Sequence, residues 1–186
     1  VLDLHGAPGG QGKNADISDY DPTKPSLWES EYNKSKTVAL WRKLAERYKD
    51  NAYVGGYDLL NETNWDVDGN TGNENGCNCN NNGPLKDLYE RIIDTVRVVD
   101  QNHLIFIEGN CWANNWNGLA SLVQYDSNIA FSWHKYWTTN SDNTIAGILD
   151  FSKNNNVPTW LGETGENSNT WFTDMVKQME RLGIGW

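Results

Sequence analysis

Two glutamates, each at the end of an apolar run, are the residues of this sequence best suited to chemistry. Glu62 ends the segment LLNE, and Glu163 ends the segment LGE. Two facing carboxyl groups can hydrolyse a glycosidic bond: one protonates the leaving oxygen, and the other attacks the anomeric carbon or activates water. The alternative is that each glutamate is an ordinary solvated loop acid. Because the two lie far apart along the chain, only the fold can bring them together.

Other polar residues also stand where apolar runs end. His5 follows the first run, Asn61 precedes the first glutamate, and His134 and Tyr136 follow the run at 129–133. Asn61 can donate a hydrogen bond to a sugar 2-hydroxyl, and Tyr136 can donate one to the carboxylate of the second glutamate. We expect His5 and His134 to be functional, whereas His103 precedes a strand and should lie at the opposite end of the fold.

Strand-like and helix-like segments alternate along the chain. Strands are expected near residues 1–5, 53–60, 104–107, 129–133 and 158–161. Apolar residues at three- and four-residue spacing predict helices near 35–50, 84–99, 143–154 and 169–182, and a short amphipathic turn near 118–125. Residues 183–186 read as the start of another strand. The order is five βα units and the opening of a sixth strand, which predicts an α/β fold with a parallel sheet.

The position of the polar residues favours a (β/α)8 TIM barrel over an open Rossmann sheet. A Rossmann fold needs a GxGxxG turn that opens a helix, and residues 6–10 (GAPGG) lack that spacing. All five predicted strands end in polar residues, at the rim where barrels build active sites. A barrel typically needs roughly 250 residues and eight strands, so residues 1–186 are expected to form one partial barrel domain, truncated at both ends. The missing segments should come from the rest of the chain or from another copy.

Charge and hydropathy restrict the partners. The chain carries 15 Lys and Arg against 25 Asp and Glu, a net charge of −10, and no lysine or arginine stripe. Nucleic acids and anionic membranes would be repelled, and no apolar run approaches the roughly 18 residues of a membrane span. We therefore expect a neutral or weakly charged substrate.

In order along the chain, the segments around these residues resemble the signatures of glycoside hydrolase family 5, in particular its endo-β-1,4-glucanases (cellulases). The resemblance runs from the family's third strand at His5 to its eighth at Trp186. It implies a TIM barrel that hydrolyses β-glycosidic bonds with retention, with Glu62 as acid/base and Glu163 as nucleophile. One departure is Thr63, where family members usually have proline. The family's second-strand arginine lies outside the resemblance.

Several of the ten tryptophans follow strand ends, where indole rings can stack on sugars. Trp186 is similar to the tryptophan that floors the family's cleft, and Trp137 is the next candidate. Trp65, Trp112 and Trp116 are further candidates. Two more, at 41 and 171, lie on helix stripes and should belong to the core.

No metal or cofactor is expected. The sequence has no HExxH, no P-loop and no GxSxG, and residues 66–77 depart from the EF-hand pattern, with Thr71 at the glycine position and Cys77 at the glutamate position. A loose calcium site in that loop remains an alternative. Cys111 can pair with Cys77 or with Cys79, or all three can be free thiols. One disulfide would fit a secreted enzyme, whose signal peptide is not in this chain.

The function expected is that of a retaining, endo-acting hydrolase of β-1,4-glucosidic bonds in cellulose or related β-glucans. Mannanase, xyloglucanase or mixed-linkage glucanase activity on the same machinery are alternatives, because the loops at 6–30 and 66–83 select the substrate. A non-catalytic carbohydrate-binding module is an alternative of another class. Binding alone needs neither glutamate, which argues against it.

Overall fold

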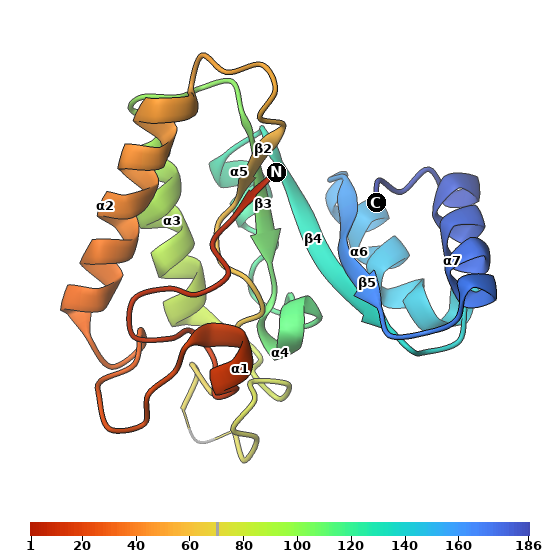
Figure 1. Cartoon of the computed structure of the whole chain (residues 1–186), viewed down its shortest axis with the longest axis horizontal. Helices are drawn as coiled ribbons and strands as arrows, with labels where there is room; N and C mark the ends of the chain where they lie inside the picture. Colours follow the sequence, from red (N-terminus) through yellow and green to blue (C-terminus); the bar gives the residue numbers. More distant parts are fainter. Residues whose placement is uncertain (70) are drawn as a thin grey trace.

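The computed structural model describes residues 1–69 and 71–186. Five parallel strands form one sheet in the order of the sequence: β1 (Leu2–Asp3), β2 (Gly56–Asp58), β3 (Leu104–Glu108), β4 (Ile129–Tyr136) and β5 (Thr159–Gly165). Helices connect them: α1 (Ala15–Ser18), α2 (Glu31–Tyr48), α3 (Gly83–Arg97), α4 (Asn110–Ala113), α5 (Leu122–Tyr125), the 3-10 turn η1 (Asp142–Ile145), α6 (Ala146–Asn155) and α7 (Asn169–Leu182). The result is a half-barrel (Figure 1).

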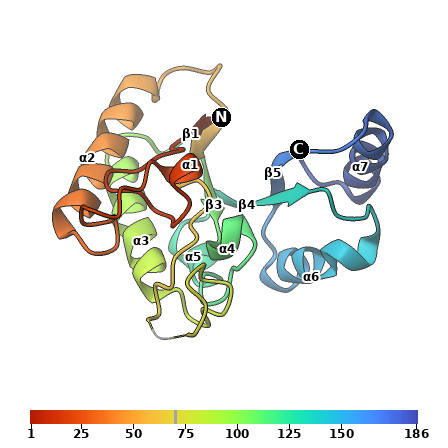
Figure 2. The same ribbon diagram turned by 60° about the horizontal axis from the view of Figure 1, so that its bottom comes forward.

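The strictly sequential strand order distinguishes this sheet from a doubly wound one, in which the order reverses at a switch point. Helices α2 and α3 pack against each other beside β2 and β3, and α6 and α7 lie beside β5 at the other end of the sheet (Figures 1 and 2). The predicted α/β class and partial TIM barrel are confirmed.

Local sequence signals explain where the long helices begin and end. Ser30 caps α2 by accepting a hydrogen bond from the backbone N–H of Asn33, so this helix starts four residues before the predicted start at 35. Pro84 lies in the first turn of α3, where its missing N–H costs nothing. Ser168 caps α7, and Gly183 ends it in the left-handed conformation.

The strand boundaries differ from the prediction in a way that matters for the site. The strand predicted at 53–60 is reduced to Gly56–Asp58. In contrast, β4 runs on to Tyr136 and β5 to Gly165, beyond the apolar runs that predicted them. The polar residues of the rim therefore lie within these two strands, because backbone pairing between β4 and β5 continues after the apolar residues end.

The core lies between the sheet and its helices. Trp41 of α2 is fully buried and donates its indole N–H to the carbonyl of Leu59. The apolar stripe of α3 is buried along its whole length, as its spacing predicted. At the amino-terminal end of β3, His103 contacts Asp100 at 2.6 Å, and Asp100 also accepts a hydrogen bond from Tyr57. This histidine lies away from the strand end that carries Glu108, as expected.

The last residues extend the sheet by one contact. The backbone N–H of Leu161 donates to the carbonyl of Gly185 at 2.8 Å, in a parallel bridge between Trp160 and Gly185. This is the position expected for a strand that follows β5. Within the described part of the chain, no helix combines the length and the apolar character that crossing a membrane requires.

Candidate active site

The carboxyl ends of the strands carry a continuous group of polar side chains. His5 follows β1, and Glu62 follows β2. Glu108 is the last residue of β3, His134 lies on β4, and Glu163 lies on β5. All except Glu108 were predicted as site residues. Because parallel strands end at the same edge of a sheet, residues far apart in the chain meet here.

Glu62 is held in an uncommon backbone conformation. Its φ is +41°, in the left-handed region that residues other than glycine rarely adopt. Its backbone N–H donates to Oε2 of Glu108 at 2.6 Å, and its side chain is nearly buried. Strained residues of this kind persist only where the surroundings hold them, and they concentrate at functional sites.

Glu163 is positioned by β4. The hydroxyl of Tyr136 donates to Oε2 of Glu163 at 2.7 Å, as the sequence suggested. A register irregularity between Trp133 and His134 pairs His134 with Glu163 across the two strands. Because of this bulge, the histidine lies directly opposite the glutamate on the neighbouring strand. Bulges of this kind are often found next to active sites.

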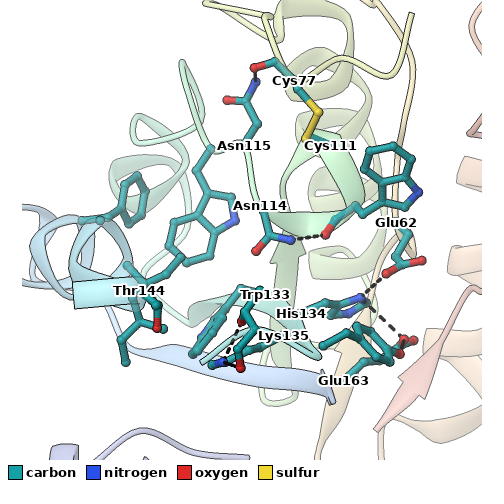
Figure 3. Close-up of a pocket in the computed structure, with 18 of the residues that line it drawn as sticks. Glu62, Cys77, Cys111, Asn114, Asn115, Trp133, His134, Lys135, Thr144 and Glu163 are labelled. Carbon is teal, nitrogen blue, oxygen red and sulfur yellow. Dashed lines mark hydrogen bonds and ion pairs between the residues drawn. A yellow bond between two sulfur atoms is a disulfide. The ribbon is translucent and has the colours of Figure 1, made fainter. Parts of the chain in front are cut away.

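His134 lies between the two predicted catalytic carboxylates (Figure 3). Its Nδ1 is 2.7 Å from Oε1 of Glu62 and 3.6 Å from Oε2 of Glu163. One oxygen of each glutamate and a ring nitrogen of His134 all lie within 4.8 Å of one another. The sequence-predicted pair is thus brought together within one small, partly buried space.

The electrostatics of this cluster centre on the histidine. Burial alone would lower the pKa of His134, but the charge of Glu108 and hydrogen bonds with Glu108 and Glu62 raise it to about 11. Burial raises the pKa of Glu108, and the charge of His134 acts against that rise. Burial also raises the pKa of Asp58, whose Oδ1 has no hydrogen-bond partner among the described residues. An imidazolium beside carboxylates is the arrangement that follows.

Two further predicted residues lie on the β1 side of the site. His5 is exposed, and its Nδ1 is 2.9 Å from Asp3 and 4.0 Å from Glu163. The amide nitrogen of Asn61 is 3.5 Å from Nε2 of His5. Gln11, which was not predicted from the sequence, is fully buried and donates to the carbonyls of both His5 and Asn61. No pattern in the sequence singled it out.

Glu108 was expected among the polar residues of the rim, but no sequence pattern assigned it a role of its own. It is 1% exposed, and its two carboxylate oxygens contact the Glu62 N–H and Nε2 of His134. A signal was present, because Glu108 ends the apolar run of β3 in the same way that the two predicted glutamates end theirs. Its complete burial is what the sequence did not reveal.

A cleft of about 1490 Å³ extends from this cluster. Trp112 and Trp137 line it, and Trp137 is 68% exposed with a φ of +30°. Trp116 also lines it, although most of this side chain packs in the core. The volume exceeds the roughly 300–1,000 Å³ of common small-molecule sites, which suits an extended ligand.

Two predicted tryptophans lie outside the residues that line this cleft. Trp65 packs edge-on against Tyr20 under the Lys13 ammonium, in a separate recess of about 350 Å³. Trp186 is 51% exposed, next to the Gly185 contact with β5. Trp171, expected in the core, is half-buried and packs against it, and its indole N–H donates to the carbonyl of Thr138 in the loop after β4.

A disulfide joins the loops that follow β2 and β3. Cys77 pairs with Cys111, and Cys79 is a buried free thiol, which resolves the alternatives that the sequence left open. Cys111 and the next two residues all have positive φ. This turn carries Cys111 and Trp112 into the wall of the cleft.

Within residues 1–69 and 71–186, two groups of potential metal-ligand atoms lie close together at the rim. The groups are Asp3, His5 and Glu163, and Glu62, His134 and Glu163. Both include Glu163, and a cation in the second would occupy the atoms that form the hydrogen bonds described above. In the loop at 66–83, Asp66 and Asp68 accept backbone N–H groups instead. Asn70 of the calcium alternative lies outside the described residues, and the expected absence of a metal stays a prediction.

Comparisons with known proteins identify the family to which the chain belongs. The family described as Cellulase (glycosyl hydrolase family 5) matches residues 1–186. A beta-xylosidase of Phanerodontia chrysosporium is 31% identical over 137 residues, covering 73% of this chain and 25% of its own length. A probable glucan 1,3-beta-glucosidase A of Aspergillus fumigatus is 29% identical over 196 residues, covering 99% of this chain and 42% of its own length. An endoglucanase of Paenibacillus polymyxa is 26% identical over 195 residues, covering 89% of this chain and 44% of its own length.

Solved structures agree on the fold. Endoglucanase Cel5A of Thermotoga maritima superposes with a TM-score of 0.67 at 21% identity, over 86% of this chain and 60% of its own. XacCel5A, solved in complex with cellopentaose, gives a TM-score of 0.66 at 21% identity, over 97% and 58%. The chain thus spans less than half the length of the curated relatives named above, and about three-fifths of these solved chains.

Proposed function

Because the chain belongs to glycoside hydrolase family 5, the cellulase family, we propose that it carries the catalytic pair of a retaining β-glycosidase. Glu62 is the acid/base and Glu163 the nucleophile. The observation that carries this proposal is the approach of the two carboxylates, with one oxygen of each within 4.8 Å. Retaining enzymes hold their carboxyl groups about 5–5.5 Å apart, whereas inverting ones leave about 6.5–9.5 Å for a water molecule.

The first step joins the sugar to the enzyme. A carboxylate oxygen of Glu163 attacks the anomeric carbon, the glycosidic C–O bond breaks, and Glu62 transfers its proton to the leaving oxygen. The Tyr136 hydroxyl, 2.7 Å from Glu163, orients the attacking carboxylate. Asn61 lies beside the acid and donates to the 2-hydroxyl, a contact that strengthens as the transition state forms.

The second step releases the sugar. Glu62, now ionised, takes a proton from water while the water oxygen attacks the anomeric carbon, and the bond to Glu163 breaks. Two inversions give net retention. His134, 2.7 Å from Glu62, holds the carboxylate that must change between acid and base.

The substrate proposed is a β-1,4-glucan, cleaved internally. An open cleft lined by Trp112 and Trp137 suits a polymer that continues past the bond being cut. The endoglucanase relatives support this preference, whereas the glucan 1,3-beta-glucosidase and beta-xylosidase relatives favour other linkages or terminal cleavage. Mannanase, xyloglucanase and mixed-linkage activity on the same pair remain alternatives.

A panel of polymers tests the substrate. Reducing-sugar release is measured on carboxymethylcellulose, galactomannan, xyloglucan, mixed-linkage β-glucan and β-1,3-glucan, with chain length followed by size-exclusion chromatography. An endo-β-1,4-glucanase shortens the chains of carboxymethylcellulose rapidly while it releases little reducing sugar. Release of monosaccharide alone, or faster cleavage of the β-1,3-glucan, would reject this substrate. Binding to cellulose without any cleavage would support the carbohydrate-binding alternative instead.

We also propose that the protein acts outside the cell. The Cys77–Cys111 disulfide supports this, because such bonds persist mainly in oxidising compartments. A polymeric substrate supports it as well. Detection of the protein in culture medium, with its disulfide intact in non-reducing mass spectrometry, is the test.

A further inference from the structure

A third carboxylate, outside the proposed acid/base and nucleophile, contacts both the backbone of the acid/base and the histidine between the pair. Glu108 is 1% exposed at the end of β3. Its Oε2 accepts the backbone N–H of Glu62 at 2.6 Å, and its Oε1 is 3.1 Å from Nε2 of His134. Burying a charged group without partners is costly, so a carboxylate kept here needs both of these contacts.

The geometry points to Glu108 as the positioning residue of the acid/base. It fixes the strained backbone of Glu62, and it holds His134 in the orientation in which the ring hydrogen-bonds to the Glu62 carboxylate. This inference rests on the proposed function, since it assigns the task of holding the proposed acid. Glu108 does not touch the reacting atoms and acts only through Glu62 and His134.

The backbone contact has a specific task. Glu62 adopts a φ of +41°, a conformation that is strained for a residue with a side chain. The hydrogen bond from its N–H to Glu108 keeps the residue in that conformation. Charge-assisted bonds of this type are roughly twice as strong as neutral ones. Without it, the turn after β2 can relax toward the common region and move the carboxyl group away from the sugar.

The contact between Glu108 and His134 determines whether the two ring nitrogens of His134 carry protons. Nδ1 of His134 faces Oε1 of Glu62, and Nε2 faces Oε1 of Glu108, so each ring nitrogen has a carboxylate as its partner. The Glu108 carboxylate accepts at Nε2, and Oε1 of Glu62 accepts at Nδ1 even when the proton that Glu62 transfers is on its other oxygen, which favours the imidazolium with both nitrogens protonated. A hydrogen-bonded second partner is the usual way in which proteins fix the orientation of a functional imidazole.

Other ionisable groups also face this cluster. Asp3 of β1, Asp58 of β2 and Glu163 of β5 act on Glu108 or His134 through their charges. Tyr89 of α3 donates its hydroxyl to the backbone carbonyl of Glu108 at 2.9 Å. Among the residues that the structure describes, however, only Glu108 contacts both His134 and the backbone of Glu62.

The variant Glu108→Gln separates these roles. Two N–H donors point at the two oxygens of Glu108, but an amide offers only one oxygen. If that oxygen stays on the Glu62 N–H, the amide NH2 faces Nε2 of His134, which can accept it only after losing its proton. The variant is nearly isosteric and should therefore convert His134 to the neutral form.

Two readouts test the inference. The chain has only three histidines, so ring ¹⁵N NMR can follow His134 directly. In the wild type we expect both ring nitrogens protonated from pH 5 to pH 9, and in Glu108→Gln a neutral ring over most of that range. We also expect kcat/KM on β-glucan to fall about 10²-fold, the lower end of what a general acid contributes. An aryl cellobioside with an activated leaving group should lose far less.

Asp100→Asn is the matched control, because Asp100 is also a buried acid bonded to a histidine. It should alter the His103 signal and leave His134 and both kcat/KM values unchanged. An ordinary titration of wild-type His134 near pH 6.5 would overturn the inference even if the variant failed to fold. So would a Glu108→Gln enzyme with unchanged His134 and β-glucan activity, or with equal losses on both substrates. A wild type inactive on every glycan would reject the proposed function. The ring ¹⁵N signals of His134 in the wild type and in Glu108→Gln would still test the role of Glu108.

Discussion

At the scale of residues, one imidazole faces three carboxylates. His134 has atoms 2.7 Å from Glu62, 3.1 Å from Glu108 and 3.6 Å from Glu163. Three acids so close together would repel one another if all were ionised. A protonated histidine among them lets two carboxylates with different tasks share one small site.

The two proposed catalytic roles predict different responses to amide substitution. Glu163→Gln removes the nucleophile and should abolish turnover on every substrate. Glu62→Gln should keep the glycosylation step on an aryl cellobioside, whose leaving group needs no proton, and lose activity on β-glucan. The measurement is the burst of phenolate together with steady-state rates. If the two variants were equally inactive on the aryl substrate, the assignment of roles would be wrong.

At the scale of elements, the site depends on loops that other parts of the chain hold in place. Gln11, from the loop after β1, joins the carbonyls of His5 and Asn61. The Cys77–Cys111 disulfide joins the loops after β2 and β3. The strands position the proposed catalytic groups, and these cross-links hold the loops around them.

The disulfide predicts a measurable share of stability. Cys77 and Cys111 are 34 residues apart, and closing a loop of that length restricts the unfolded chain by about 3–4 kcal/mol. A double Cys77→Ser, Cys111→Ser variant should lose about this much in urea unfolding. Reductant should destabilise the wild type to a similar extent and leave the double variant unchanged. Equal effects of reductant on both proteins would contradict a closed disulfide.

Asp100 predicts a pH-dependent stability. Burial alone would raise its pKa, but hydrogen bonds from Tyr57, from the backbone of Asn102 and from His103 lower it overall. A carboxyl group with a depressed pKa stabilises the fold above its unfolded pKa, about 3.9, and loses that contribution as the pH falls through the folded value. Asp100→Asn should therefore destabilise by about 1–3 kcal/mol at pH 7.

The deficit of Asp100→Asn should shrink as the pH falls below about 3.9 and on through the lower folded pKa of Asp100, because the wild type then loses the same interactions. Chemical unfolding at a series of pH values measures it. A deficit independent of pH would show that the side-chain charge contributes nothing, and that only packing is lost.

Much of the fold and part of the site could be predicted from sequence, for physical reasons. Apolar periodicity located every strand of the sheet, because burial imposes a pattern on the residues. It failed at strand ends: the pairing of His134 with Glu163 is fixed by backbone hydrogen bonds, which leave no apolar signature. The positive φ of Glu62 and the burial of Glu108 depend on neighbours from other strands, so no local pattern encodes them.

At the scale of the whole molecule, the charge of the chain should affect its choice of polymer. A net charge of −10 creates a repulsive potential for an anionic glycan, and salt screens it. The screening length falls from about 30 Å at 0.01 M to about 3 Å at 1 M ionic strength. Activity on carboxymethylcellulose should therefore rise with added salt, whereas activity on neutral β-glucan should stay constant. An identical salt response on both polymers would contradict this prediction.

The buried thiol of Cys79 has a consequence for how the molecule is made. Three cysteines allow three single-disulfide isomers, and the folded protein uses only the one between Cys77 and Cys111. Thiolates exchange disulfides while the chain is still open, and Cys79 stands two residues from a bonded partner. Folding ends this competition, because it buries Cys79 near Asn110 and raises the pKa of the thiol. An expression host that oxidises the chain before it folds will therefore yield mixed isomers, and replacing Cys79 with alanine removes two of the three.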